Sequence, residues 1–224
     1  MTGFPRSPRV QKGAIIGLDK FNPLASIVIF QYNPETLSRT LTAQTSGEAG
    51  DEEEALRLKA PPKESIQVKI ELDAADQLEQ GDALAESLGV YPALASLEML
   101  LYPKSVAVIA NEVLKAAGAV EVIPPEAPLT LFYWGIKRLL PVRINTLTIN
   151  EQHFDPNLNP IHAEVSLTME VLSYYDLGLL SVGGALYMGN QIIKEAMATI
   201  SGLSNIAGAV SGAASGSVNF SLGA

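Results

Sequence analysis

The clearest period-two pattern of the chain lies between His162 and Val171. Five apolar residues alternate there with five polar ones, and the apolar set is Ala163, Val165, Leu167, Met169 and Val171. Because successive side chains of a strand point to opposite faces, this alternation predicts an antiparallel strand with one buried face and one solvated face. Ser65–Leu72 repeats the pattern and predicts a second strand.

Leu139–Asn150 is rich in β-branched residues, but its pattern changes phase along the segment. Two apolar pairs fall on opposite faces of an ideal strand, Val142 with Ile144 and Leu147 with Ile149. The phase change predicts a β-bulge near Asn145 and Thr146. In the segment that follows, Glu151–Pro160, two prolines lack amide donors and two asparagines tolerate turn conformations, so we expect a hairpin with a long, ordered loop.

The remaining elements are predicted from shorter patterns. Residues 14–20 and 26–32 read as a strand pair broken at Asn22-Pro23, and 37–43 is expected at the edge of the sheet. Pro61-Pro62 is expected to fix where the strand at 65–72 begins. Helices are predicted over 92–101, ended by Pro103, and over 105–118, followed by extended chain; 73–90 is expected to be loop or a short helix.

These patterns divide the chain into four parts. Residues 1–13 form an extended N-terminal arm, and 14–178 form a β domain with a mobile acidic loop at 44–60, because GEAGDEEE has no compensating cation. A C-terminal helix is predicted over 179–200, and 201–224 is predicted to be a Ser/Gly/Ala-rich tail without a charged residue. The fold class is therefore mainly β with α (α+β).

Composition excludes several classes of function. The chain has 224 residues and a formal net charge of -9, which disfavours a nucleic-acid groove. It has no cysteine, so disulfides and thiolate metal sites are excluded, in keeping with a reducing cytoplasm. The N-terminal residues lack the apolar segment of a secretory signal. A membrane-contacting role for the uncharged tail is the less favoured alternative, because Ser, Gly and Asn interrupt it throughout.

The sequence predicts no catalytic, cofactor or metal site. No nucleophile elbow, P-loop, dinucleotide fingerprint or HExxH motif is present. The acidic segment lacks the spacing of a calcium loop. His153 and His162 flank one loop with Asp155 between them, but His162 falls on the polar face of its strand, so we expect no metal there. The protein is thus predicted not to be an enzyme.

Several motifs together resemble the tube-like domain of contractile injection systems, in particular the adaptors between inner tube and spike in extracellular, phage-tail-like particles. The resemblance covers roughly residues 12–200 and rests on FQYNPETL, on a Trp-Gly before LPVRI, and on the FDPNLNP loop. The residues that carry it, which we take as structural or interface candidates, are Phe30, Tyr32, Asn33, Pro34, Trp134, Gly135, Arg143, Phe154, Asp155, Pro156, Asn157 and Leu158.

The resemblance implies a tube-type antiparallel β-barrel or sandwich with one or two packed helices. It also implies sixfold rings in which the sheets of neighbouring protomers join around a channel. The partners that the resemblance implies are further copies of the chain in a hexameric ring, together with the tube, spike or hub, and baseplate proteins of the same particle.

Many such adaptors carry a C-terminal LysM module, and this chain has none after Ile200. An inner-tube subunit or tube initiator, and a membrane-linked assembly factor, therefore stay open as alternatives. Two side chains also have two readings. Trp134 is either a core residue or an anchor between subunits, and Arg143 is either buried and paired or directed into a lumen.

Overall fold

A computed structural model describes residues 11–18, 27–45, 57–116 and 127–215, with side chains up to residue 206. The strands are β1 (Ala14–Leu18), β2 (Ile27–Ile29), β3 (Leu37–Thr45), β4 (Leu58–Asp73), β5 (Leu129–Tyr133), β6 (Leu139–Phe154) and β7 (Pro160–Val171). The helices are α1 (Ala75–Glu79), α2 (Ala83–Leu88), α3 (Tyr91–Glu98), α4 (Ser105–Ala116), α5 (Tyr174–Leu177) and α6 (Val182–Ser215). The α+β class is confirmed.

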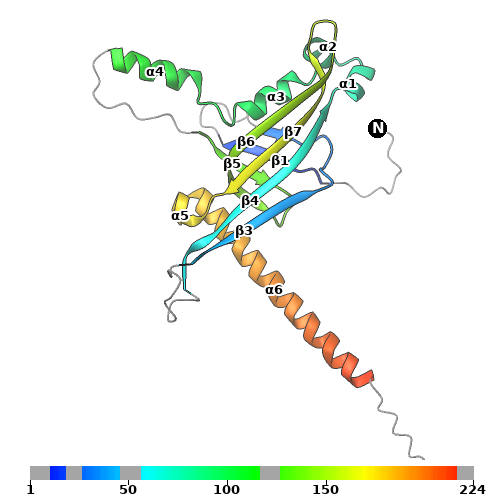
Figure 1. Cartoon of the computed structure of the whole chain (residues 1–224), viewed down its shortest axis with the longest axis vertical. Coiled ribbons are helices and arrows are strands. Elements are labelled where there is room, and N and C mark those ends of the chain that lie inside the picture. Colours follow the sequence, from blue (N-terminus) through cyan, green and yellow to red (C-terminus); the bar gives the residue numbers. More distant parts are fainter. Residues whose placement is uncertain (1–10, 19–26, 46–56, 117–126, 216–224) are drawn as a thin grey trace, which may run out of the picture.

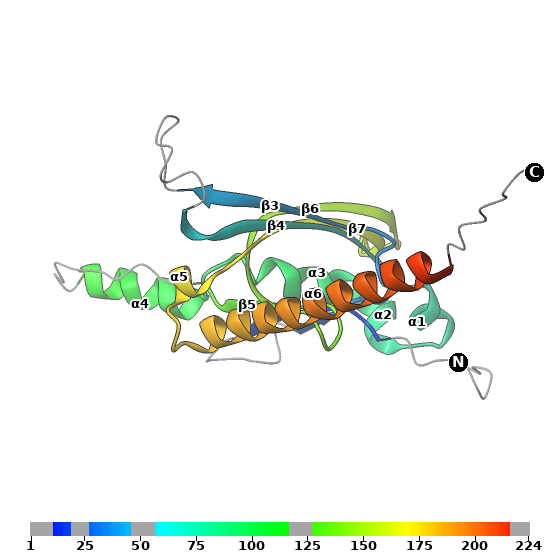
Figure 2. The same ribbon diagram turned by 90° about the horizontal axis from the view of Figure 1, so that it is seen from below.

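All seven strands belong to one antiparallel sheet in the order β2-β1-β5-β6-β7-β4-β3. Its four long strands, β6, β7, β4 and β3, run side by side, and β5, β1 and β2 curve away beneath them (Figures 1 and 2). Among the described strands no pairing joins β2 to β3, so the expected closure into a barrel is not confirmed.

The predicted alternation of β7 is confirmed, because its five apolar side chains are all buried. The predicted bulge is confirmed as well, since the register of β6 against β7 shifts between Ile144 and Thr146. With the extra residue in place, Ile144 pairs with Met169 and Leu147 with Leu167. The two apolar pairs of β6 therefore share the core face, although an ideal strand would separate them.

Several predicted boundaries are wrong. β2 ends at Ile29, three residues before its predicted end at residue 32. β6 and β7 leave only residues 155–159 between them, so the hairpin loop is short and not the long loop predicted over Glu151–Pro160. β4 begins at Leu58 and passes through Pro61-Pro62, where its register against β3 shifts between Thr42 and Gln44. A bulge leaves the proline nitrogens outside the ladder, which is why pairing continues past them.

The predicted bounds of the acidic loop, 44–60, are also wrong, because β3 and β4 pair as far as Thr45 and Leu58. Residues 46–56 lie outside the described part, as do 1–10 of the predicted arm and the extended chain predicted after the helix at 105–118. α6 continues from the predicted end at residue 200 to Ser215, so the tail prediction is wrong for 201–215, and 216–224 lie outside the described residues.

The core lies between the apolar face of the sheet and α3, whose Leu94 and Leu97 are buried in the same cluster as Val165 and Phe132. The β6–β7 loop is fixed to this helical layer at Gly89, where φ is +57°. A Cβ there would lie 2.1 Å from the Pro160 carbonyl oxygen, which accepts a hydrogen bond from the Val90 amide at 2.9 Å. Only glycine allows this approach.

Candidate functional site

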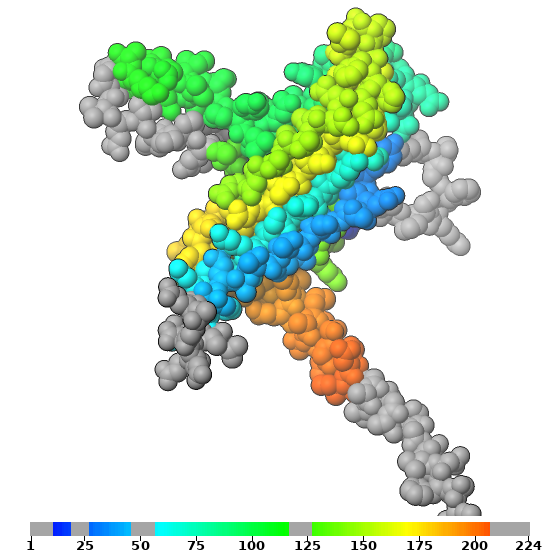
Figure 3. Space-filling model, in the orientation of Figure 1, coloured from blue at the N-terminus to red at the C-terminus, as the bar shows by residue number. Residues whose placement is uncertain are grey.

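The face of the four long strands that points away from the core is polar throughout. Register and alternation place on it the hydroxyl, amide and charged side chains of Ser38, Thr40, Thr42, Ser65, Gln67, Lys69, Glu71, Arg143, Thr146, Thr148, Asn150, Gln152, His162, Glu164, Ser166, Thr168 and Glu170. Figure 3 shows these strands side by side with no helix over them. We call this surface the polar face.

Two ion pairs join neighbouring strands on the polar face. Arg143 contacts Glu170 at 2.7 Å, and Lys69 contacts Glu164 at 2.8 Å. The hydrogen bond and the charge of Lys69 lower the pKa of Glu164, and the same bond raises the pKa of Lys69. Cations and anions thus neutralise one another locally, and the face has little net charge of its own. Arg143 is exposed and paired with Glu170, so it is not the buried, paired side chain of the first expectation, and its position facing a lumen stays a prediction.

Both long edges of this four-stranded unit are open among the described residues. β3 is the last strand in the sheet order. On the other side, β5 pairs with β6 only from Leu139 to Val142, so β6 offers a free edge from Arg143 to Phe154. Neither edge carries a proline within 37–45 or 143–154. Exposed edges of this length present unpaired amide and carbonyl groups to other chains.

Four of the predicted site residues meet in an aromatic corner where β5 turns into β6. The Trp134 ring stacks on Phe132 with centroids 5.7 Å apart and lies 6.4 Å from the buried Phe30. Asn33 accepts a hydrogen bond from the Gly13 amide and donates one to the Gln11 carbonyl. Gly135 has φ +80°, as the tight turn requires. The aromatic corner therefore consists of side chains that pack within the chain, which favours the core role for Trp134.

Tyr32 and Pro34 flank this corner without joining it. Tyr32 is exposed, and the negative charge of Asp76 is the largest cause of its raised pKa. Pro34 is partly exposed just before β3. Neither side chain makes a contact that indicates a binding role.

The remaining candidates form the β6–β7 loop at the opposite end of β6. Asp155 accepts hydrogen bonds at 2.7 Å from the amides of Asn157 and Asn159, and the Asn159 side chain donates to its second oxygen. The bond from that side chain is the largest cause of the lowered pKa of Asp155. Leu158 adopts φ +66°, and its side chain, like those of Phe154 and Pro156, is exposed. The loop is thus rigid internally and displays apolar side chains.

The candidate residues consequently do not form one site. They divide between the two ends of β6, with Arg143 on the polar face.

The two histidines lie close together near the β6–β7 loop. The ring centroids of His153 and His162 are 6.3 Å apart, and His162 Nδ1 lies 3.4 Å from an Asp73 carboxylate oxygen. No group of three metal-ligating side chains exists among the described residues. The described helices also include none that is long and apolar enough to cross a membrane.

A buried carboxylate that the sequence did not indicate joins the two strands β3 and β4 to α6. Glu64 on β4 is 4% exposed, and its carboxylate accepts from Arg39 Nε on β3 at 2.6 Å and lies 3.3 Å from Lys194 Nζ on α6. The charge of Arg39 also acts on Arg138, whose pKa is lowered mainly by burial and further by the positive charge of Arg39. A buried carboxylate with two cationic partners 25 and 130 residues away has no local sequence signal.

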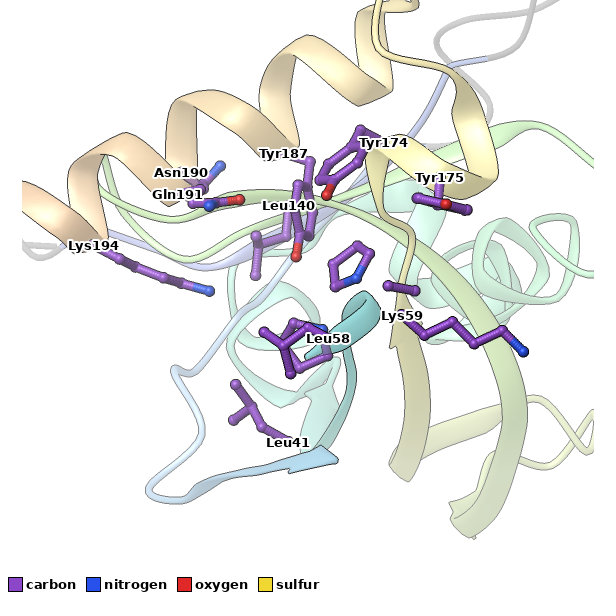
Figure 4. Close-up of a pocket in the computed structure, with 13 residues that line it drawn as sticks. Leu41, Leu58, Lys59, Leu140, Tyr174, Tyr175, Tyr187, Asn190, Gln191 and Lys194 are labelled. Carbon is purple, nitrogen blue, oxygen red and sulfur yellow. The ribbon is translucent and has the colours of Figure 1, made fainter. Parts of the chain in front are cut away.

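A cavity of about 380 Å³ opens beside these contacts, between the β3–β4 end of the sheet and α5–α6. Leu41, Leu58 and Leu140 line it together with Tyr174, Tyr187 and Lys194. Figure 4 shows the Tyr187 hydroxyl and the Lys194 ammonium reaching into it. Burial is the main cause of the raised pKa of Tyr187. The cavity holds no arrangement of nucleophile, base and orienting group.

Comparison with known proteins adds no family. No family model matches the chain, and no curated protein matches it.

Proposed function

We propose that this protein is a structural ring component of a contractile injection system that joins the inner tube to the spike or baseplate. The observation that supports this function best is the four-stranded unit with one polar, uncovered face and two open edges. A stable monomer would be expected to cover such edges. In a ring, each edge is covered by the neighbouring protomer.

The strand directions are compatible with ring closure. Neighbouring strands within β6-β7-β4-β3 are antiparallel, so β3 and β6 run in opposite directions. When β3 of one protomer meets β6 of the next around a rotation axis, the new pair is antiparallel, like every other pair in the sheet. The locally neutral polar face would then line the channel, and the core, α3 and α6 would lie outside it.

The dimensions follow from strand spacing. Four strands from each of six protomers, about 4.8 Å apart and tilted by about 40°, close into a wall about 45–50 Å across between opposite backbones. The function proposed is then mechanical: matching surfaces above and below transmit sheath contraction to tube and spike. It requires no catalysis or cofactor. Assembly would occur in the cytoplasm, before the particle is released or meets a membrane.

The test has two steps. A tagged chain is recovered from its native producer, partners are identified by mass spectrometry, and the eluate is imaged by negative stain. We expect tube, sheath and baseplate proteins in rod-shaped particles. Recovery of a monomer without partners would contradict the proposed function.

Charge substitutions on the two edges test the ring itself. Thr40→Glu and Thr42→Glu on β3, combined with Thr146→Glu and Thr148→Glu on β6, place like charges across the proposed junction. The matched variant carries Lys instead of Glu at 40 and 42. We expect the first to lose rings at low salt and the second to keep them, because cross-strand pairs of like charge are unfavourable. Equal assembly of the two variants would contradict edge-to-edge joining.

A further inference from the structure

α6 crosses the core side of the sheet and then leaves it. Near its start, Asn190 Nδ2 donates to the Leu139 carbonyl on β6, and one turn later Lys194 reaches Glu64 on β4. Glu64 in turn binds Arg39 on the edge strand β3. Beyond Lys194 the helix passes this edge and projects from the body of the protein (Figures 1 and 2). We call the part from Ala196 onward distal α6.

Distal α6 exposes large apolar side chains. Ile200, Leu203 and Ile206 are 58%, 65% and 64% exposed, and Met197 is 43% exposed. The sequence has no charged residue from Ala196 to its end. A helix rich in Ser and Gly gains most of its stability from tertiary packing of an apolar face, so this face is expected to have a partner.

α4 projects from the other side of the protein and has the same character. It has no buried residue. Val106, Ile109 and Val113, spaced as one face of a helix, are 72%, 63% and 63% exposed. Its charged residues Glu112 and Lys115 pair with each other at 2.6 Å. Because Glu112 and Lys115 neutralise each other, neither adds an unpaired charge to the apolar face of α4. This face therefore suits an uncharged partner.

The positions of the two helices decide which partner fits. Figure 1 shows α4 on the β6 side of the sheet and distal α6 leaving past β3, and Figure 2 shows both on the core side. They point away from each other, so one chain cannot bring them together. Complementary patches at opposite sides of one molecule form a heterologous contact between copies, as a closed ring requires.

We infer that the apolar face of α4 packs on distal α6 of the neighbouring protomer. This inference rests on the proposed ring, in which β6 of one protomer meets β3 of the next and so brings α4 to the neighbour's α6. α4, with 12 residues, is about 18 Å long. A single helix pair of that length buries less than a standard stable interface, so the contact reinforces the joined strands and is weak without them.

Disulfide crosslinking tests the contact, because the natural chain has no cysteine. Ile109→Cys and Leu203→Cys are made in separate full-length chains, mixed, allowed to assemble and oxidised. We expect a covalent dimer of the two different chains, of 2 × 23.8 = 47.6 kDa, in the mixture and little with either variant alone. The matched control replaces Ile109→Cys by Lys115→Cys on the opposite face of α4 and should give several-fold less dimer.

Three results would overturn the inference. The first is a dimer of Leu203→Cys with itself that forms in preference to the mixed dimer, which would indicate that α6 pairs with α6. The second is an equal yield of dimer with the Lys115→Cys control. The third is the absence of any crosslinked dimer. Negative-stain images of the same samples separate the two proposals. Rings without the mixed dimer reject the α4–α6 contact and keep the ring, whereas absence of both rings and dimer rejects both.

Discussion

The two faces of the sheet β6-β7-β4-β3 differ in what holds their side chains. On the core face, Val165, Leu167 and Met169 are buried in the same hydrophobic cluster as side chains of β4, β6 and α3. On the polar face, Ser166 is exposed, and the ion pairs Lys69–Glu164 and Arg143–Glu170 each join neighbouring strands of that face. The core face therefore carries the stability of the fold, while the polar face is free to serve an assembly. Substitutions on matched positions of the two faces should separate these roles.

The largest effect is expected from Val165→Asp. Val165 is fully buried in the middle of β7, and a charge there has no partner. We expect a loss of more than about 4 kcal/mol of unfolding free energy, most of the stability of an ordinary domain. Folding and assembly should then be lost together. Circular dichroism and urea unfolding measure this.

Ser166→Asp is the control, one residue along on the polar face. We expect it to change the unfolding free energy by less than about 0.5 kcal/mol, because its side chain is solvated. A folded Val165→Asp variant, or an unfolded Ser166→Asp variant, would mean that the two faces are assigned the wrong way round.

An intermediate effect is expected at Glu64, whose carboxylate lies on the core side but binds two cations. Glu64→Ala removes the acceptor shared by Arg39 and Lys194. Because both cations still reach water, we expect a cost of about 1–2 kcal/mol, below that of breaking a fully buried pair. Hydrogen exchange should increase in α6 around Lys194. Glu71→Ala on the polar face is the control, with a change below about 0.5 kcal/mol; equal costs for both variants would contradict the coupling of α6 to the sheet.

The sequence predicted what depends on local periodicity. The strand at 162–171, the bulge after Ile144, the edge position of β3 and the helix before Pro103 all follow from alternation, phase or proline. The full length of β4 was missed because prolines usually end a ladder, whereas here a bulge accommodates them. α6 was ended too early because Ser and Gly in 201–215 disfavour a helix by propensity alone.

The candidate site was less predictable for a physical reason. The motif residues make local contacts that stabilise single turns, as Asp155 does in the β6–β7 loop and Trp134 does in the aromatic corner. The surfaces that the proposal uses depend on contacts between distant parts of the chain. The free edge of β6 exists because β5 begins only at Leu129 and pairs with β6 no further than Val142, and the path of α6 depends on Glu64. Neither relation leaves a periodic pattern in the sequence.

The smallest effect is expected from the pair of Lys69 and Glu164 on the polar face. Lys69 lowers the pKa of Glu164 in the folded protein, so the pair stabilises the fold above the ordinary carboxyl pKa of 4.5 and ceases to do so as the pH falls through the lowered value. Glu164→Gln should therefore lower the melting temperature slightly at about pH 7, and this difference should shrink as the pH falls below 4.5 and the natural carboxyl takes up a proton. Thermal unfolding across this range measures the difference between variant and natural chain. A difference that grows on acidification would mean that Glu164 is not held in its charged form by Lys69, and that the charges of the polar face are not paired as described.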